Sequence, residues 1–214
     1  MRWSSETEKT TTLARVSLTA RSLRSTATAM ISTRHRRFER RIWPPCCAGC
    51  SPDMCGVTGI FAPAQSVSSD DLTRWTDCAA NTLRHRGPDD GAAWVDPEAG
   101  VALGHRRLSI IDLSATGRQP MTSATTRYVV AFNGEIYNYP AMRAELAAGG
   151  ASFRGHSDTE VLLAAVERWG FEGALKRANG MFAVAMWDRE NRCLYLARDR
   201  FGQKPLYVAW AKQA

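Results

Sequence analysis

Cys55 is the residue best suited to nucleophilic chemistry, because it directly follows Met54 at the start of an apolar stretch. If Met54 is the true start and is removed, Cys55 carries a thiol and a free α-amine on one residue. Such an amine titrates at roughly 7.7–8.0 in model peptides, so part of it is neutral and can take the thiol proton. Gly56 and Gly59 would let a reacting group approach the backbone. The alternative is a buried packing cysteine, against which this stretch alone is weak evidence.

Four further positions carry polar groups that could act on a substrate. Asn133-Gly134 is a strong hairpin-turn signal, but a side-chain amide beside a glycine N–H at a strand end also makes an oxyanion hole. Arg107 is either a solvated charge or a fork onto a substrate carboxylate. Asp158 is expected in the first turn of a helix on dipole grounds, and Glu135 is an ordinary polar residue unless it meets a ligand.

Short apolar runs predict the strands that would position these residues. The continuous run at 128–132 is typical of a sheet buried on both faces, and it leads directly into Asn133. Strands, helices and strands follow one another in an order that predicts an α+β layered domain with a mostly antiparallel sheet. The expected strands cover residues 55–62, 92–95, 101–106, 128–132, 181–187 and 193–197, the last two forming a hairpin.

Capping residues and one-sided apolar spacing predict three helices. The first begins after the N-cap candidates at 68–71 and ends near the Gly and Pro residues of 84–91. Its apolar face is Leu72, Trp75, Ala79 and Leu83. The second helix covers 140–148, and the third opens at a capping box made by Ser157 and Glu160.

The net charge of +7 is concentrated in residues 1–53, which hold ten Lys and Arg against four Asp and Glu. Residues 54–214 are nearly neutral, so a nucleic-acid-binding surface is not expected there. Residues 1–53 are rich in Ser and Thr and show no sustained periodicity, which predicts a disordered basic leader. A transit peptide, a basic tail and a start codon placed too far upstream are the three explanations, and Met54 favours the last.

The cysteines and the apolar runs of the sequence indicate the cellular compartment and the kinds of site and partner to expect. Cys46, Cys47 and Cys50 crowd together without a second cluster or a nearby pair of histidines, so a zinc site is not predicted. Only two cysteines follow Cys55, too few for a disulfide framework, which favours a reducing, cytoplasmic setting. No apolar run approaches the roughly 18 residues that a transmembrane helix needs, so no membrane partner is expected.

Several short segments belong to one recognisable set, in a fixed order along the chain. They are residues 54–56, 85–91, 105–112, 132–138, 157–160, 179–182 and 197–207. Together they make residues 54 to about 210 resemble the glutaminase domain of class II glutamine amidotransferases, specifically the asparagine synthetase type. This resemblance implies the four-layer α/β/β/α sandwich of N-terminal-nucleophile hydrolases, with a leader at 1–53 and a glutamine amidotransferase type 2 domain at 54–214.

The resemblance also implies hydrolysis of L-glutamine to glutamate and ammonia. Cys55 would attack the side-chain amide while its own α-amine relays protons. Asn133 and the N–H of Gly134 would hold the tetrahedral oxyanion. The implied substrate-binding residues are Arg107 for the α-carboxylate, Glu135 and Asp158 for the α-ammonium, and the backbone of Leu108, Ser109, Ile110 and Ile111 as pocket lining.

Two departures from the family pattern limit the expectation. The Ser-Gly-Gly-rich phosphate loop of the family's ATP-binding domain does not occur, so no cofactor or metal is expected in this chain. ATP and Mg²⁺ would act only in a separate synthetase domain or chain, a possible partner. Cys55 also follows 54 residues, where its nitrogen is an amide. The alternatives are therefore a non-catalytic glutamine-binding module blocked by the leader, or the glutaminase domain of another amidotransferase.

Overall fold

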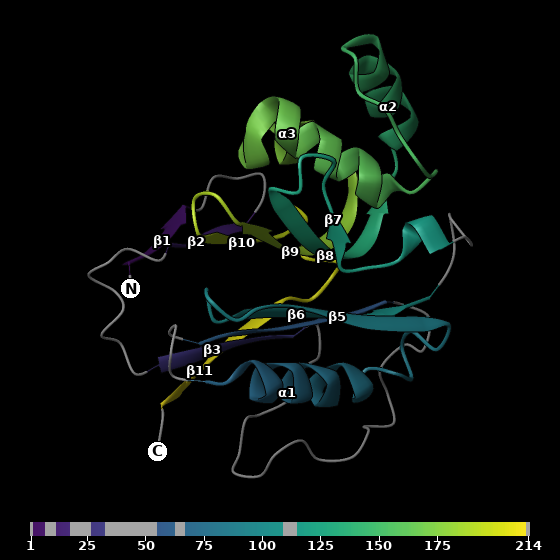
Figure 1. Ribbon diagram of the computed structural model, residues 1–214. Helices are drawn as coiled ribbons and strands as arrows, with labels where there is room; N and C mark the ends of the chain where they lie inside the picture. Colours follow the sequence, from purple (N-terminus) through teal and green to yellow (C-terminus); the bar gives the residue numbers. More distant parts are fainter. Residues whose placement is uncertain are drawn as a thin grey trace.

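The computed structural model describes residues 2–6, 12–17, 27–32, 55–62, 67–108 and 115–212. Two β-sheets lie face to face, and helices cover the outer side of each, which gives four layers in the order α/β/β/α (Figure 1). Every strand pair among the described residues is antiparallel. The predicted α+β class and the four-layer sandwich are therefore confirmed.

The two sheets are called A and B, and each draws strands from distant parts of the sequence. In spatial order, sheet A consists of β1 (Arg2–Glu6), β2 (Thr12–Ser17), β10 (Cys193–Arg198), β9 (Gly180–Asp188), β8 (Tyr128–Ile136) and β7 (Met121–Thr122). Sheet B consists of β11 (Tyr207–Lys212), β3 (Ala27–Ser32), β4 (Gly56–Phe61), β6 (Val101–Arg107) and β5 (Asp90–Asp96). Helix α1 (Ser69–Asn81) packs on sheet B, and α3 (Asp158–Arg177) packs on sheet A beside α2 (Tyr139–Ala148). A short 3₁₀ turn, η2 (Ala115–Gly117), precedes β7.

Three strands lie within residues 1–53, so the prediction of a leader without regular structure is wrong for β1, β2 and β3. Strand β2 pairs with β10 in sheet A, and β3 lies between β4 and β11 in sheet B. Sequence periodicity reports which side chains a segment buries, whereas these strands gain their backbone hydrogen bonds from the edges of other strands. Cys46, Cys47 and Cys50 lie outside the described residues. The division of the chain at residue 53 stays a prediction.

Strand alternation places polar side chains of β8 in the layer between the sheets. Successive side chains of a strand point to opposite faces. Val129 and Ala131 belong to the apolar cluster between sheets A and B, so Asn133 and Glu135 share that face. Phe132 belongs instead to the cluster between sheet A and the helices.

The same alternation brings residues of sheet B into this layer. On β6, Leu103 belongs to the apolar cluster between the sheets, so His105 and Arg107 follow it on the same face. On β4, Val57 belongs to that cluster, and Cys55 precedes it by two residues. The layer between the sheets therefore receives three predicted site residues. They are the nucleophile Cys55, Arg107, which would bind a carboxylate, and the oxyanion donor Asn133.

Several local predictions need correction. Asn133-Gly134 is not a hairpin turn, because β8 continues to Ile136 and pairs with β9 as far as Gly180. The first helix ends at Asn81, and Trp75 leaves 42% of its surface exposed although it was expected on the buried face. The hairpin of β9 and β10 and the helix predicted at 140–148 are confirmed.

The capping box at α3 is only half formed. The hydroxyl of Ser157 accepts the backbone N–H of Glu160, as expected. The Glu160 carboxylate instead accepts the backbone N–H groups of Arg154 and Gly155, which ties the preceding loop to the helix. The N-terminus of α3 is therefore capped and fixed, which matters because Asp158 is its first residue.

Candidate active site

Cys55 lies where the start of β4 meets the end of β6, because Gly56 pairs with Arg106. Its Sγ accepts the backbone N–H of Leu108 at 3.3 Å and lies 3.5 Å from the carbonyl oxygen of the same residue. The thiol is free and half-buried. Burial raises the pKa of the Cys55 thiol, while the Leu108 N–H and the charges of Arg107 and Lys204 favour the thiolate. The nucleophile thus has donors and cations beside it and still needs a base.

Arg107 is the last residue of β6, and it is buried although it carries a permanent charge. Its guanidinium acts electrostatically on both Cys55 and the neighbouring His105. A guanidinium presents two parallel donors that match a carboxylate, so a buried arginine at this position suits the predicted role of binding an anionic group. Leu108 contributes its backbone to the thiol, whereas Ser109, Ile110 and Ile111 lie outside the described residues.

Asn133 holds an unused donor in the middle of the protein. The residue is 2% exposed, and its Nδ2 has no hydrogen-bond partner in the part of the chain that the structure describes. An unpaired buried amide donor costs about 1–3 kcal/mol, so native structures retain one mainly where a ligand or transition state completes it. The predicted role as an oxyanion donor accounts for this cost.

Gly134 follows Asn133 in a position that accepts only glycine. A Cβ at this residue would lie 2.2 Å from the carbonyl oxygen of Met181 on β9. The backbone groups of Phe132 and Ile136 face the edge of β8 that points away from β9, since side chains from outside the sheet bind them there. Gly134 lies between the two and presents its own N–H at the same edge. The amide of Asn133 and this N–H are the two predicted oxyanion donors.

Asp158 and Glu135 place two carboxylates near the end of β8. The buried Asp158 accepts the backbone N–H of Ile136 at 2.9 Å, which joins α3 to this strand. Burial raises the pKa of Asp158 to about 6; the backbone N–H groups of Ile136 and Thr159 oppose this rise, and the charge of Glu135 adds to it. A bound cation would relieve this repulsion, so the pair suits an ammonium group.

Lys204 is a candidate site residue to which the sequence alone assigned no role. It is 5% exposed, and its backbone N–H is held by the buried Asp199 at 2.9 Å. Burial and the charge of Arg86 lower the pKa of Lys204, while Cys55, Asp199 and Glu135 raise it. The Cys55 thiol and the carboxylates of Asp199 and Glu135 therefore all lie close enough to Lys204 to act on its charge. The signal that could have identified Lys204 is its place in the segment 197–207, which the resemblance marked without a function.

His105 connects the two sheets at the level of the site. Its Nε2 lies 3.0 Å from the carbonyl oxygen of Phe132, which can only accept, so the imidazole carries its proton on Nε2. Burial lowers the pKa of His105 to about 4, and the ring is therefore neutral at pH 7. This bond fixes the end of β6, which leads to Arg107, against the residue that precedes Asn133.

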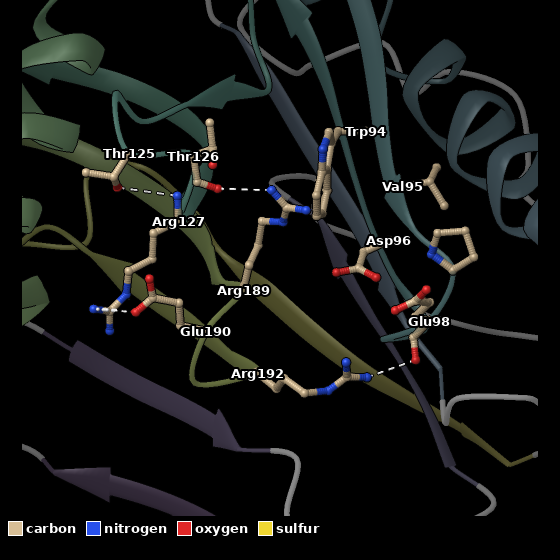
Figure 2. A pocket seen from close by; sticks show the side chains of 11 residues that line it. Trp94, Val95, Asp96, Glu98, Thr125, Thr126, Arg127, Arg189, Glu190 and Arg192 are labelled. Atoms are coloured by element: carbon tan, nitrogen blue, oxygen red, sulfur yellow. Dashed lines mark hydrogen bonds and ion pairs between the residues drawn. The ribbon is translucent and has the colours of Figure 1, made fainter.

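A separate polar pocket of about 560 Å³ lies near the first residues of β6 and β8, at the ends away from Arg107 and Asn133 (Figure 2). Its arginines have partners: Arg127 pairs with Glu190, Arg189 donates to the Thr126 carbonyl, and Arg192 donates to the Glu98 carbonyl. None of the predicted site residues lines this pocket.

Two other kinds of feature are absent from the described residues. They contain no group of three or more His, Cys, Asp or Glu side chains placed to hold a metal ion. No helix among them is both long enough and apolar enough to cross a membrane.

Comparisons with known proteins identify relatives of this chain. The sequence model of a family described as "Glutamine amidotransferase domain" matches residues 54–214. Asparagine synthetase [glutamine-hydrolyzing] 1 of Bacillus subtilis (strain 168) is 43% identical over 157 residues, which cover 72% of this chain and 24% of that protein. Asparagine synthetase [glutamine-hydrolyzing] 3 of the same strain is 41% identical over 156 residues, with shares of 72% and 24%. The chain spans about a quarter of the length of these curated relatives.

One solved structure adds a weaker likeness. It is glutamine phosphoribosylpyrophosphate amidotransferase from B. subtilis complexed with ADP and GMP, at 14% identity and a TM-score of 0.39. The match covers 81% of this chain and 35% of that one.

Proposed function

The chain belongs to the family of glutamine amidotransferase domains, and from this premise we propose that it hydrolyses L-glutamine to glutamate and ammonia. The ammonia would serve a glutamine-hydrolysing asparagine synthetase system, as the names of the curated relatives suggest. The observation that carries the proposal is the buried Asn133 Nδ2, which has no hydrogen-bond partner among the described residues and faces the same inter-sheet layer as Cys55 and Arg107.

The proposed reaction has two halves. The sulfur of Cys55 attacks the side-chain amide carbon, and the α-amine of the same residue takes the thiol proton. The oxyanion that forms is stabilised by Asn133 Nδ2–H and the N–H of Gly134. The α-amine then delivers its proton to the leaving nitrogen and the C–N bond breaks. Ammonia departs, and a thioester between Cys55 and the substrate remains. Water attacks this thioester, its proton passes through the amine to the sulfur, and glutamate leaves.

Substrate orientation follows from the charges around the thiol. Arg107 would form a bidentate pair with the α-carboxylate of glutamine, because a guanidinium presents two parallel donors. Asp158 and Glu135 would hold the α-ammonium. With a pKa of about 6, Asp158 is mostly ionised at pH 7, and a bound ammonium group would lower that pKa further. The backbone of residues 108–111 would line the remaining side of the pocket.

The base in this reaction exists only when Cys55 is an N-terminal residue. In the 214-residue chain its nitrogen belongs to a peptide bond with Met54 and has no basic lone pair. We therefore expect the uncleaved chain to be inactive and a form that begins at Cys55 to be active. Removal of Met54 before a small residue such as cysteine would produce that form.

Three forms of the protein test this proposal. They are the full chain, a protein translated from Met54, and a full chain cut after folding at a protease site placed to end at residue 54. The third form keeps β2 and β3, which pair with β10 and with β4 and β11. Ammonia release is measured for each, with intact mass to establish the first residue and Cys55→Ala as the control.

The expected result is ammonia release and labelling of Cys55 by a glutamine-analogue electrophile only in forms with a free α-amine on Cys55. Equal rates for the uncleaved chain would refute the N-terminal-nucleophile mechanism. Glutamine binding without ammonia release in all three forms would favour a non-catalytic glutamine-binding module.

The partner and compartment complete the proposal. We propose that ATP, Mg²⁺ and the activation of the ammonia acceptor belong to a synthetase domain or chain outside residues 54–214, as the names of the curated relatives suggest. The free thiols of Cys55, Cys78 and Cys193 support a reducing cytoplasm. Co-purification of the chain with a synthetase partner, and asparagine formation on mixing, would test this part.

A further inference from the structure

One edge of β8 lacks a neighbouring strand over most of its length. Strand β7 covers only Val129 and Val130 of β8. From Ala131 to Ile136 this edge has no strand partner among the described residues, although β9 pairs with the other edge throughout. The backbone groups of alternate residues in an antiparallel strand point to the same edge, so those of Phe132, Gly134 and Ile136 face this gap.

Side chains from three separate elements occupy the uncovered edge. The Oε1 of Gln119 accepts the N–H of Phe132 at 2.7 Å, and the Nε2 of His105 donates to the Phe132 carbonyl at 3.0 Å. At the far end, Asp158 accepts the N–H of Ile136 at 2.9 Å. Gly134 lies between these fixed points.

Gln119 also links this edge to the helix that carries Asp158. Its Nε2 donates to the hydroxyl of Thr159 at 3.3 Å, and both residues are buried. One side-chain amide therefore joins the residue before Asn133 to the residue after Asp158. Because Gln119 and Thr159 are both buried, water is poorly placed to replace either bond, and a shift of one end must strain the other.

We propose that Gln119 is a positioning residue that, together with His105, sets the orientation of the oxyanion donors at Asn133 and Gly134 and couples it to Asp158. This inference rests on the proposed glutaminase function. Gln119 does not reach the reacting atoms; it acts by holding the Phe132 peptide, from which the two donors follow directly along β8. Misplacement of a catalytic group by about 1 Å can reduce the rate about 10²-fold.

Three variants separate positioning from general stability. Gln119→Leu removes both hydrogen bonds at similar volume, whereas Thr159→Val removes only the bond to α3. Thr76→Val is the matched control, because the buried Thr76 hydroxyl donates to the Leu72 carbonyl on α1, away from this strand edge. Gln119→Glu retains an acceptor for Phe132 and serves as the conservative variant.

In the form that hydrolyses glutamine, Gln119→Leu should lower kcat about 10- to 100-fold with a smaller change in KM. Gln119→Glu should recover part of this loss, and Thr76→Val should leave kcat within about twofold of the wild type. In an Asn133→Ala background the effect of Gln119→Leu should be smaller than in the wild type, since one of the two donors that Gln119 orients is already absent. An unchanged kcat for Gln119→Leu, or a full additional loss in that background, would overturn the proposal.

Hydrogen exchange of the Phe132 amide, measured by NMR on the full chain, gives a readout that needs no activity. Its exchange should become at least about tenfold faster in Gln119→Leu, and remain as in the wild type in Thr76→Val. If the wild type releases no ammonia in any form, the proposed function fails, while this exchange still tests whether Gln119 holds the Phe132 peptide. Equal exchange of Phe132 in the wild type and Gln119→Leu would refute it.

Discussion

Replacing Asn133 by alanine should reduce activity without reducing stability. The side chain is 2% exposed, and its Nδ2 has no partner in the described part of the chain. The folded protein therefore already bears the cost of an unsatisfied buried donor, about 1–3 kcal/mol. Alanine removes that cost and leaves a small cavity that acts in the opposite direction. We expect the free energy of unfolding to change by about 1 kcal/mol or less.

The effect on catalysis should be larger. Loss of one preorganised oxyanion donor typically lowers kcat about 10²–10³-fold, equivalent to about 2.7–4 kcal/mol of transition-state stabilisation. Gly134 would still supply one N–H, so some activity should remain. KM should change little, because the ground-state amide oxygen needs this donor less than the oxyanion does.

The assay combines ammonia release with urea unfolding of the same preparations. Asn191→Ala is the control, since the Asn191 amide donates to Asp188 in the hairpin of β9 and β10. That variant should lose stability and keep its kcat. If Asn133→Ala unfolds more easily by about 2 kcal/mol while its kcat stays within threefold of the wild type, the Asn133 side chain is structural and the oxyanion assignment is wrong.

Three other outcomes are expected. Arg107→Lys should raise KM by an amount equivalent to about 1.5–3 kcal/mol, because lysine loses the bidentate fork; an unchanged kcat/KM would exclude the clamp. Gly134→Ala should lower the melting temperature, because its Cβ would meet the Met181 carbonyl. Between pH 4 and 6, the free energy of unfolding of Asp158→Asn should decrease as pH falls, whereas that of His105→Gln should increase. Calorimetry measures both; parallel plots of stability against pH for the two variants would refute this.

The signs of these pH effects follow from the two pKa shifts. The folded-state pKa of Asp158, about 6, lies above its unfolded value, so the stability it contributes is present below about pH 4 and lost as pH rises to 6. The folded-state pKa of His105, about 4, lies below its unfolded value, so its contribution is present above about pH 6.5 and lost as pH falls to 4. In the wild type the two contributions oppose each other, and each variant exposes one of them.

The shared direction of three site side chains could be predicted from the sequence by strand alternation. Once β4, β6 and β8 are placed, a period of two directs Cys55, Arg107 and Asn133 into one layer. The turn signal of Asn133-Gly134 misled because turn propensity is local, whereas Ala183 and Phe182 of β9 hold this pair in a strand.

Gln119 could not have been predicted in the same way. Its two partners, Phe132 and Thr159, lie 13 and 40 residues further along the chain, and a glutamine before a proline in a loop has no periodic signature. The strands β2 and β3 were missed for a related reason, since their partners β10 and β11 lie far away in sequence.

The uncovered edge of β8 also bears on solubility. An open strand edge offers a row of unpaired backbone groups on which another chain can add a strand, and such edges promote aggregation. Here Gln119, His105 and Asp158 cap the groups on both sides of Gly134, which leaves too short a free stretch for a foreign strand to register. The side chains that shape the proposed site thus also oppose the addition of a strand at this edge.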